Sequence, residues 1–312
     1  MRTENHTPSP AGNHTPSPAG NHTPSPAGDA GTGALDAAAL QAAVIRPGGL
    51  WRAVEVTGVT GSTNTDLLAR AADGEPEGVV LAAERQTAGR GRMGRAWVAP
   101  LGTALTFSLL IRPEAVPRAR RGWLPLLAGV AAASAVRALA ATDARLKWPN
   151  DLLAGPADAL AGGSGGGVPP GKLGGILAEA AGNAVVVGIG VNVSAAPGEL
   201  PPPGPGALAA TSLRAQGWAS PDRELLLAEI LAGFERRYRA WCQAAGDPER
   251  SGLRAEYTRL CDTIGRRVRV ELPGGQLLSG GAAGIDSDGR LVVRTSPGSE
   301  AAVAAGDVIH LR

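Results

Sequence analysis

The sequence predicts a mixed α/β domain followed by a small β-barrel. Helical runs with apolar faces alternate with short apolar runs of strand character between residues 34 and 260. From Thr263 onward the pattern changes to short alternating strands separated by glycine-containing turns, which is typical of a small closed barrel. We therefore divide the chain into a tail over residues 1–30, an α/β domain over residues 31–262 and a barrel over residues 263–312.

Length and composition favour a cytoplasmic protein with a sizeable core. The chain has 312 residues, of which 44% are hydrophobic, and a net charge of +2 that does not favour nucleic acid or a membrane surface as its main partner. Cys242 and Cys261 provide neither metal-site spacing nor a disulfide scaffold. We find no signal peptide and no apolar run of about 18 residues, so we expect no membrane association.

The N-terminal tail is a tandem repeat. Residues 5–12, 13–20 and 21–28 are three copies of Asn-His-Thr-Pro-Ser-Pro-Ala-Gly. Such a segment lacks the apolar side chains that would offset its loss of entropy on ordering, so we expect residues 1–30 to be disordered. Its three histidines could bind a metal weakly, but a low-complexity repeat is the simpler interpretation.

The first half of the α/β domain is expected to hold two short helices and three strands. Residues 34–45 are rich in alanine and leucine and predict a helix, and the alternation over residues 51–56 predicts a strand. Ser62 or Thr63 is a natural N-cap for the next helix. Two apolar runs, at residues 78–83 and 105–111, predict the other strands.

The second half combines a long helix with a hairpin. Residues 123–141 are rich in alanine and predict a helix that backs the sheet, and the proline within Lys147–Asp151 ends regular structure at a strand edge. Residues 155–171 are rich in glycine and proline and predict a flexible insertion, which is either a mobile lid or, as we favour, a neutral surface loop. The apolar runs that meet at the turn of residues 181–183 predict a β-hairpin at the sheet centre.

Two helices precede the barrel. After a loop over residues 197–206, a helix is expected over residues 221–244, with Ser220 as its cap and Pro221 at its first position. Its apolar residues at every fourth position predict core packing: Leu226, Ile230, Phe234 and Tyr238. A second helix is expected at about residues 249–260, and the barrel strands at residues 267–271, 277–285, 290–294 and 308–311.

The segment from Glu84 to Trp97 combines glycine with arginine, most densely at Gly89–Arg92. Glycine permits close backbone approach to a ligand, and arginine offers a fork of donors that matches carboxylate or phosphate. The segment also matches G-x-G-x-x-G. However, the run that follows predicts a strand rather than the helix of a dinucleotide-binding turn, and the kinase sequences H-R-D and D-F-G are absent. An anion-binding loop is therefore favoured over a solvated basic turn.

Lysine and asparagine are unusually scarce. Only two of the 30 basic residues are lysines, Lys147 and Lys172, which suggests two sites that need a compact ammonium group. Helix capping does not explain Asn64, because asparagine is a poor helix former inside a first turn. Outside the repeat the asparagines are Asn64, Asn150, Asn183 and Asn192.

Five segments in this order resemble the biotin–protein ligases: Ser62–Asn64, Gln86–Trp97, Lys147–Asp151 (KWPND), Lys172–Leu177 (KLGGIL) and Gly188–Val193 (GIGVNV). The resemblance implies a mixed-sheet catalytic domain of the biotin/lipoate ligase fold, followed by a small SH3-like barrel. It also implies a two-step reaction. The biotin carboxylate attacks the α-phosphate of ATP to give biotinyl-5′-AMP and pyrophosphate, and a lysine of a biotin carboxyl carrier domain then takes the acyl group.

The resemblance further implies the biotin site and the catalytic residues, which are Lys172, Arg90 and Arg92. Lys172 would stabilise the developing acyl-phosphate bridge, and the two arginines would order the loop around the adenylate. Polar side chains would pair with the ureido head of biotin, and Trp97 would stack on biotin or adenine. The implied biotin-binding residues are Ser62, Thr63, Asn64, Gln86, Arg90, Gly91, Arg92, Trp97 and Lys172.

The implied substrates are ATP and biotin, with Mg²⁺ as the metal. Asn150 and Asp151 would orient phosphates or Mg²⁺, and Asn192 would read the adenine edge. Lys147 would position phosphate or serve a structural role. The implied ATP-binding residues are Arg90, Arg92, Arg95, Lys147, Asn150, Asp151 and Asn192.

The implied protein partner is the biotin carboxyl carrier domain of acyl-CoA carboxylases. Bifunctional ligases of this family carry an N-terminal helix-turn-helix domain, whereas residues 31–50 are too short for one, so we expect no DNA binding. The alternatives are a lipoate- or octanoate-protein ligase on the same fold, a non-catalytic nucleotide-binding or regulatory module, and a transcriptional regulator. Ser62–Asn64 and the arginine-dense loop argue against the lipoate ligase.

Overall fold

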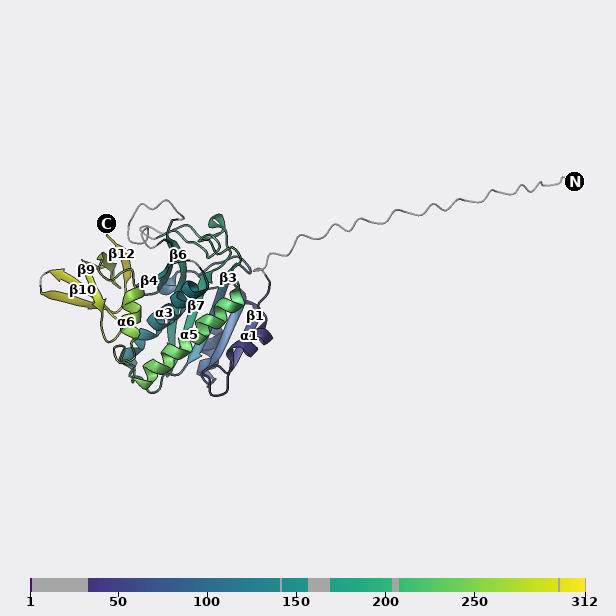
Figure 1. Ribbon diagram of the computed structural model, residues 1–312, viewed down its shortest axis with the longest axis horizontal. Helices are drawn as coiled ribbons and strands as arrows, with labels where there is room; N and C mark the ends of the chain where they lie inside the picture. The colour runs from purple at the N-terminus through teal and green to yellow at the C-terminus, as the bar shows by residue number, and fades with distance from the viewer. Residues whose placement is uncertain (2–32, 141, 157–168, 204–207, 297, 312) are drawn as a thin grey trace.

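The computed structural model describes residues 1, 33–140, 142–156, 169–203, 208–296 and 298–311. They form a unit around a seven-stranded mixed sheet, beside which lies a smaller unit around a five-stranded antiparallel sheet (Figure 1). This arrangement confirms the predicted fold class. The expected disorder of residues 1–30, and most of the insertion expected at residues 155–171, fall outside the described residues.

The larger sheet has the strand order β1-β2-β3-β7-β6-β5-β4, in which β1 and β2 are parallel and the other neighbours antiparallel. The β6–β7 hairpin lies near its centre, as predicted. Its strands are β1 (Ala53–Thr60), β2 (Val79–Gln86), β3 (Ala104–Ile111), β4 (Ala144–Lys147), β5 (Asp151–Ala154), β6 (Gly171–Ala181) and β7 (Ala184–Asn192). The helices are α1 (Ala37–Val44), α2 (Thr63–Ala72), η1 (Arg92–Gly94), η2 (Arg118–Gly122), α3 (Trp123–Leu139), η3 (Pro197–Glu199), α5 (Arg223–Gln243) and α6 (Leu253–Leu260).

The two faces of this sheet are covered unequally. Helices α3 and α5 pack on one face, where Phe107 of β3 and Ile189 of β7 join the main hydrophobic core. The shorter α2 lies on the other face, where Leu67 belongs to a second, smaller core. Because side chains alternate along a strand, Ser108 and Gly188 point to the α2 face. Small and polar residues there leave room for a cavity.

Helix α3 belongs to the core of the fold, although its sequence is apolar enough to resemble a membrane-spanning segment. Together with η2 it forms the segment Arg118–Leu139, which is long and apolar enough to cross a membrane by length and composition alone, with a mean hydropathy of 1.4. In its most apolar window, 67% of the segment is buried inside the fold. Packing between α5 and the sheet therefore accounts for the composition.

Helices α5 and α6 begin later than predicted. Asp222, rather than Ser220, is the N-cap of α5, because Asp222 Oδ1 accepts two backbone N–H groups of the first turn, each at 2.9 Å. Pro221 therefore precedes the cap. Helix α6 begins at Leu253, after a turn in which Asp247 Oδ1 accepts the N–H of Glu249 at 2.9 Å. A local aspartate bond fixes the boundary of α5, whereas α6 follows Gly252, whose φ of +76° is left-handed. Apolar periodicity alone shows neither boundary.

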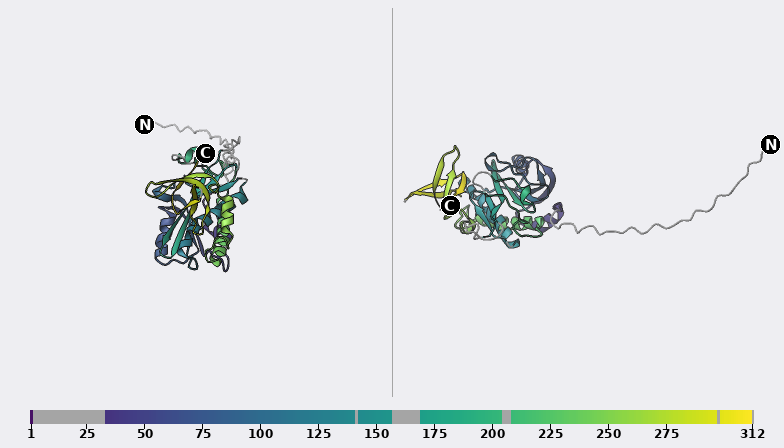
Figure 2. Two further views of the ribbon diagram at one scale, coloured as in Figure 1. Left: turned by 90° about the vertical axis from the view of Figure 1, so that its left-hand side faces the viewer. Right: turned by 90° about the horizontal axis from the view of Figure 1, so that it is seen from above.

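The smaller sheet has the strand order β11-β10-β9-β8-β12 and lies at one end of the molecule (Figure 2). Strand β11 was not predicted, since its sequence Ser-Glu-Ala-Ala-Val is poor in β-branched residues and its pairing with β10 is what defines it. No pairing joins β11 to β12 in the described part, so the ring of a closed barrel is not completed there. The strands are β8 (Arg267–Glu271), β9 (Leu277–Ile285), β10 (Leu291–Ser296), β11 (Ser299–Val303) and β12 (Asp307–His310).

A buried ion pair joins α5 to the start of the arginine-rich segment. Arg223 Nη1 lies 2.7 Å from Glu84 Oε2, and the two side chains are 2% and 10% exposed. The same guanidinium donates to the carbonyl oxygens of Ala104 and Gly33, at 3.3 and 2.6 Å. Because each charge is paired and hydrogen-bonded, the pair anchors the beginning of the loop instead of destabilising the core.

Candidate active site

A cavity opens on the α2 face of the seven-stranded sheet. Its wall combines the start of α2, the end of β2, the loop over residues 87–97, and strands β3, β6 and β7. The structure brings to this cavity all of the residues predicted for the biotin site, which lie up to 110 positions apart in the sequence (172 − 62 = 110). They are Ser62, Thr63, Asn64, Gln86, Arg90, Gly91, Arg92, Trp97 and Lys172.

The floor of the cavity is the bare backbone of β7 at Gly188 and Gly190. A Cβ atom at Gly188 would lie 2.3 Å from Asn64 Oδ1, and one at Gly190 would lie 2.5 Å from Trp97 Cε2. Both distances are far inside van der Waals contact, so only glycine allows these two side chains to rest against the strand. The glycines of the GIGVNV segment therefore create the space in which a ligand can lie.

A chain of hydrogen bonds orders the polar end of the cavity. The backbone N–H of Thr63 donates to Gln86 Oε1 at 2.8 Å, and Ser108 Oγ donates to Asn64 Oδ1 at 2.6 Å. Thr63 Oγ1 lies 2.7 Å from Ser108 Oγ and 3.0 Å from Gln86 Oε1. The Thr63 hydroxyl donates to Gln86 Oε1, and its oxygen lies within hydrogen-bond distance of the Ser108 hydroxyl. Gln86 is thus held through its oxygen by Thr63, and its side chain lines the cavity.

Asn64 connects α2 to β6, which explains an asparagine in a first helical turn. Its Nδ2 donates to Glu179 Oε2 at 2.8 Å and to the carbonyl oxygen of Leu177 at 3.2 Å. Glu179 Oε2 also accepts a hydrogen bond from Arg90 Nη2, at 2.9 Å. The loop arginine is therefore tied through one carboxylate oxygen to the residue that orders the polar end.

Ser62 occupies the N-cap position of α2, but its side chain makes no capping hydrogen bond. The N-cap therefore lies at Ser62, one of the two predicted positions, although its side chain does not make the bond that usually accompanies a serine cap. The residue is only 4% exposed, and its hydroxyl lines the cavity without a protein partner among the described residues. A hydroxyl in this position is available to hydrogen-bond a polar ligand.

Both lysines of the chain lie around one carboxylate. Lys172 Nζ is 2.6 Å from Asp151 Oδ1, with the two side chains 36% and 22% exposed. Burial lowers the pKa of Lys147, while the charge of Asp151 opposes that shift and the charge of Lys172 adds to it. The two lysines of the sequence therefore lie at one place in the structure.

A second cleft adjoins the cavity on the side of the smaller sheet. Arg95, Asn150 and Lys172 line both spaces. The rest of its lining combines apolar residues, among them Trp148, with four charged side chains from the two units: Lys147, Asp151, Glu271 and Asp307. The shared residues mark the point where a molecule in the cavity would meet one in the cleft.

The arginines of the loop differ in their surroundings. Burial lowers the pKa of Arg92, against the opposing charge of Asp307, and Arg92 Nη1 lies 3.5 Å from Asn150 Oδ1. Arg95 Nη2 pairs with Asp307 Oδ1 at 2.8 Å, so the loop touches β12 of the smaller sheet directly. Arg90 is exposed apart from its bond to Glu179.

Asn192 is not brought to the cavity or to the adjoining cleft. The residue is 5% exposed, and its Nδ2 donates to the carbonyl oxygen of Thr211 at 3.0 Å. It shares the strand parity of Gly188 and Gly190, but the chain around Thr211 covers it at the end of β7. This arrangement contradicts the expectation that Asn192 is open to read an adenine edge.

The described residues contain no group of three or more histidine, cysteine, aspartate or glutamate side chains that could hold a metal ion. Asp151 is the one predicted metal ligand, and its Oδ1 is already paired with Lys172. A single carboxylate beside an ammonium group does not fit a resident metal. It does fit Mg²⁺ that arrives with phosphate oxygens as most of its ligands.

Three functional residues were missed from the sequence: Ser108, Glu179 and Asp307. Ser108 lies within an apolar strand, and Glu179 within a strand that continues past the KLGGIL segment. The partners of the three residues are 44 to 212 positions away, so no local pattern marks them. Only the presence of a polar side chain on the otherwise apolar strand β3 could have indicated Ser108.

Family models match both units of the chain. The Biotin/lipoate A/B protein ligase family matches residues 56–194, and the Biotin protein ligase C terminal domain matches residues 263–311. The chain is 45% identical to the biotin--[acetyl-CoA-carboxylase] ligase of Mycobacterium tuberculosis, over 89% of this chain and 96% of that protein. It is 31% identical to the bifunctional ligase/repressor BirA of Bacillus subtilis, over 77% of this chain and 69% of that protein.

Solved structures share the fold. The biotin protein ligase of Aquifex aeolicus in complex with biotin and ATP matches with a TM-score of 0.65 at 23% identity, over 83% of this chain and 98% of that one. The Leishmania major ligase in complex with biotinyl-5-AMP matches with a TM-score of 0.51, also at 23% identity, over 83% of this chain and 98% of that one. With the sequence matches to both units, these findings show that the chain belongs to the biotin protein ligase family.

Proposed function

We propose that the chain activates biotin with ATP and transfers it to a lysine of a biotin carboxyl carrier protein, with Lys172 stabilising the first step. The observation that carries this proposal is the junction of the two spaces, where Arg95, Asn150 and Lys172 line both the cavity and the charged cleft. An acid in the cavity would present its carboxylate at this junction to phosphates in the cleft.

The junction supplies the charge that the first step needs. A biotin carboxylate and ATP are both anionic, and each repels the other. At about 4 Å and an effective dielectric constant near 20, one positive charge offsets roughly 4 kcal/mol of such repulsion. Lys172, with Arg92 and Arg95 beside it, provides that charge as a carboxylate oxygen bonds to the α-phosphorus and pyrophosphate leaves. An acceptor lysine then attacks the acyl carbon, and AMP leaves.

The polar end of the cavity suits the ureido head of biotin. The head carries one carbonyl oxygen and two N–H groups, and Ser62 and Gln86 line the cavity with polar side chains. An acid without these groups would leave the polar side chains unmatched, which costs more than an ordinary hydrogen bond gains. This supports biotin over lipoate or octanoate.

Mg²⁺ is expected to enter with ATP, since the described residues offer it only isolated carboxylates at the cleft. Asp151 would then lie between Lys172 and the metal–phosphate complex and could interact with either. Asp151 would hold the ion together with phosphate oxygens, and Lys172, whose Nζ lies 2.6 Å from Asp151 Oδ1, would supply positive charge to the carboxylate.

The partner and the compartment follow from the same chemistry. By analogy with the relatives named above, the acceptor is the biotin carboxyl carrier domain of an acyl-CoA carboxylase. Both cysteines are free, which suits the reducing cytoplasm. The described residues before β1 contain the single helix α1.

Removal of the Lys172 ammonium group tests this proposal. In Lys172→Ala, biotin incorporation into a carrier domain should fall by about 10²–10³-fold, as for the loss of other groups that stabilise developing charge. The melting temperature should stay near that of the unmodified protein, because Lys172 is partly exposed. Arg259→Ala removes an exposed cation on α6 and should retain full activity. Unchanged turnover in Lys172→Ala would refute the role given to Lys172.

A further inference from the structure

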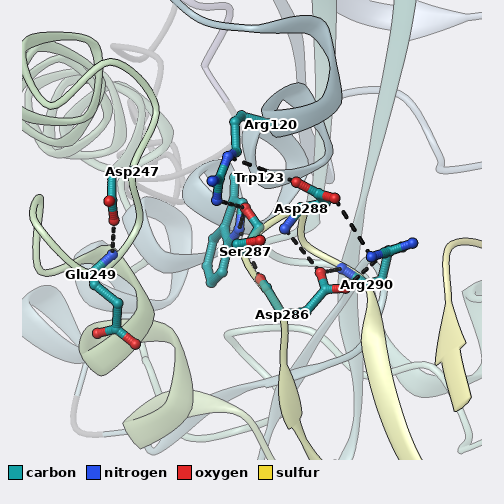
Figure 3. A network of polar contacts seen from close by, with 8 residues as sticks. All are labelled: Arg120, Trp123, Asp247, Glu249, Asp286, Ser287, Asp288 and Arg290. Carbon is teal, nitrogen blue, oxygen red and sulfur yellow. Dashed lines mark hydrogen bonds and ion pairs between the residues drawn. The ribbon is translucent and has the colours of Figure 1, made fainter.

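The turn between β9 and β10 is clamped by donors from the larger unit. Arg120 Nη1 donates to the carbonyl oxygen of Ser287 at 2.7 Å, and Trp123 Nε1 donates to those of Ser287 and Asp286 at 3.1 and 3.2 Å. Within the turn, Asp286 Oδ1 accepts the backbone N–H groups of Asp288 and Arg290, each at 2.9 Å. Figure 3 shows these side chains converging on the turn. The turn is therefore rigid and fixed relative to η2 and α3.

Close backbone contact tightens the same junction. A Cβ atom at Gly122 would lie 2.3 Å from the carbonyl oxygen of Asp288, and one at Gly289 would lie 2.8 Å from the carbonyl of Gly122. Gly289 also has a φ of +85°, which favours glycine on its own. The two backbones touch where no side chain could be placed, so the position of the Gly289 carbonyl is well defined.

Trp148 binds to this fixed turn and to the segment before β8. Its indole Nε1 donates to the carbonyl oxygen of Gly289 at 3.2 Å, and its backbone N–H donates to Thr263 Oγ1 at 3.0 Å. The side chain is 1% exposed, and Thr263 is fully buried. Next to Trp148 in the chain, the carbonyl oxygen of Leu146 accepts the N–H of Asp262 at 2.7 Å. Three hydrogen bonds thus tie residues 146–148 to residues beyond α6.

The residues on either side of Trp148 face the charged cleft. Lys147, Asn150 and Asp151 line that cleft, and Asp151 is the partner of Lys172. Asn150 Nδ2 also donates to the carbonyl oxygen of Ile176 at 3.0 Å, on the strand that carries Lys172. A displacement of Trp148 would therefore move the groups expected to meet the phosphates, while the polar end of the cavity would stay in place.

We propose that Trp148 is a positioning residue, through which the C-terminal sheet fixes the Lys147–Asp151 segment for use of ATP. The inference rests on the proposed function only for the identity of the nucleotide. Trp148 lines the space beside the turn and also the charged cleft, but not the cavity, so it lies outside the wall that would meet biotin. Its contribution is the placement of its neighbours.

Thr263 completes the anchor through its hydroxyl. The oxygen accepts the Trp148 N–H, and it lies 3.1 Å from Nε2 of His310 on β12. Its one proton can be donated to that nitrogen when His310 is neutral. Replacement of Thr263 by valine keeps the shape of the side chain but leaves the buried Trp148 N–H without an acceptor, whereas serine keeps the hydroxyl.

Two substitutions test the anchor by kinetics. In Trp148→Phe and in Thr263→Val, kcat/KM for ATP in biotin-dependent pyrophosphate exchange should fall about tenfold, which is the effect of one lost buried hydrogen bond. The Kd for biotin alone should change by less than about threefold, because the Ser62 and Gln86 end of the cavity lies elsewhere. Thr263→Ser should restore most of the ATP-dependent loss.

Trp241→Phe is the matched control. Trp241 is fully buried on α5, and its Nε1 has no hydrogen-bond partner among the residues that the structure describes, so the change removes the same indole volume without removing a bond seen there. This variant should keep kcat/KM for ATP near that of the unmodified protein. Equal losses for ATP and for biotin in Trp148→Phe, in proportion to a loss of folded protein, would overturn the proposal. So would an equal ATP-specific loss in Trp241→Phe.

Hydrogen exchange provides a readout that does not depend on catalysis. Amides of residues 147–152 should exchange faster in Trp148→Phe than in Trp241→Phe, both without ligand. Absence of exchange activity in the unmodified protein would count against the proposed function alone. Unchanged protection of residues 147–152 in Trp148→Phe would overturn the anchor, whatever the activity.

Discussion

Ser108 shows how one side chain can order a whole binding site. It is fully buried on β3 and links the hydroxyl of Thr63 to the amide oxygen of Asn64. In Ser108→Ala both groups lose their contact with Ser108, and Asn64 Oδ1 loses a hydrogen-bond donor, while the cavity keeps its shape. We expect the Kd for biotin to rise about tenfold and the free energy of unfolding to fall by about 1–3 kcal/mol. Calorimetric titration with biotin and chemical denaturation would measure the two effects.

Ser212→Ala is the control for Ser108→Ala. Ser212 is also fully buried, and its hydroxyl donates to the carbonyl oxygen of Ala195 at 2.7 Å, away from the cavity. The Ser212→Ala variant should lose about as much stability as Ser108→Ala but keep the affinity of the unmodified protein for biotin. If both variants weakened biotin binding equally, the role of Ser108 in ordering the site would be disproved.

At the residue scale, the sequence predicts the side chains that stand in its unusual segments but not those in ordinary strands. Asn64 and Lys172 were found because lysine and asparagine are scarce, and both lie at the cavity. Ser108 and Glu179 were missed because their roles depend on contacts across the sheet. Asn192 was misplaced because strand parity does not show that the chain around Thr211 covers it.

Strand β7 can form the floor of the cavity because two of its residues, Gly188 and Gly190, have no side chain. Gly188→Ala would place a Cβ atom 2.3 Å from Asn64 Oδ1, so either the strand or Asn64 must move. We expect the Kd for biotin to rise at least about tenfold, with a loss of about 1–3 kcal/mol of stability from overpacking. Titration with biotin and thermal unfolding would measure both.

Gly284→Ala provides the comparison for Gly188→Ala. Gly284 lies on β9 of the smaller sheet, where a Cβ atom would meet no other atom within 4 Å. That variant should bind biotin as the unmodified protein does. Normal affinity in Gly188→Ala would mean that the cavity floor tolerates a side chain and that the close packing of Asn64 has no bearing on the ligand.

At the element scale, apolar periodicity predicts most helices and strands, and local capping sets their ends. The β6–β7 hairpin was expected from two apolar runs around a short turn, and it lies where predicted. The start of α5 was misplaced because Asp222 competes with Ser220 for the cap and accepts two backbone N–H groups. Strand β11 was missed because only its neighbour β10 specifies it.

At the scale of the whole molecule, the junction of the two units contains a titratable group. Burial lowers the pKa of His310 to about 4, with the charges of Lys147 and Arg266 adding to the shift. The unfolded chain binds the proton near pH 6.5, so stability from this residue is present above pH 6.5 and is lost as the pH falls toward 4. The full loss amounts to about 3 kcal/mol.

The substitution His310→Gln should remove the contribution of this residue to the pH dependence of the unfolding free energy between pH 6.5 and 4. Glutamine cannot titrate, so the difference in unfolding free energy between the two proteins should change as the pH falls from 6.5 to 4 and stay constant above pH 7. Asp262, whose pKa is raised mainly by burial, lies beside His310 and contributes to both profiles, so the difference is the relevant quantity. Chemical denaturation at stepped pH measures it, and parallel profiles would contradict the assignment.

The larger conclusion is that two units build one reaction site. The α2 face of the mixed sheet forms a cavity with a polar end, and the junction with the smaller sheet forms a charged cleft that shares Lys172 with it. The ion pair between Arg95 and Asp307, at 2.8 Å, connects the glycine-rich loop to β12. Activation of an acid by ATP is what this geometry is suited to perform.

The most direct test of that claim is ATP–pyrophosphate exchange driven by free acids. Biotin should support rapid exchange, whereas lipoate and octanoate should support at least about a hundredfold less, since neither can match the polar groups at the Ser62 and Gln86 end. Exchange with lipoate or octanoate and none with biotin would contradict the account, and so would exchange that proceeds equally well without any acid.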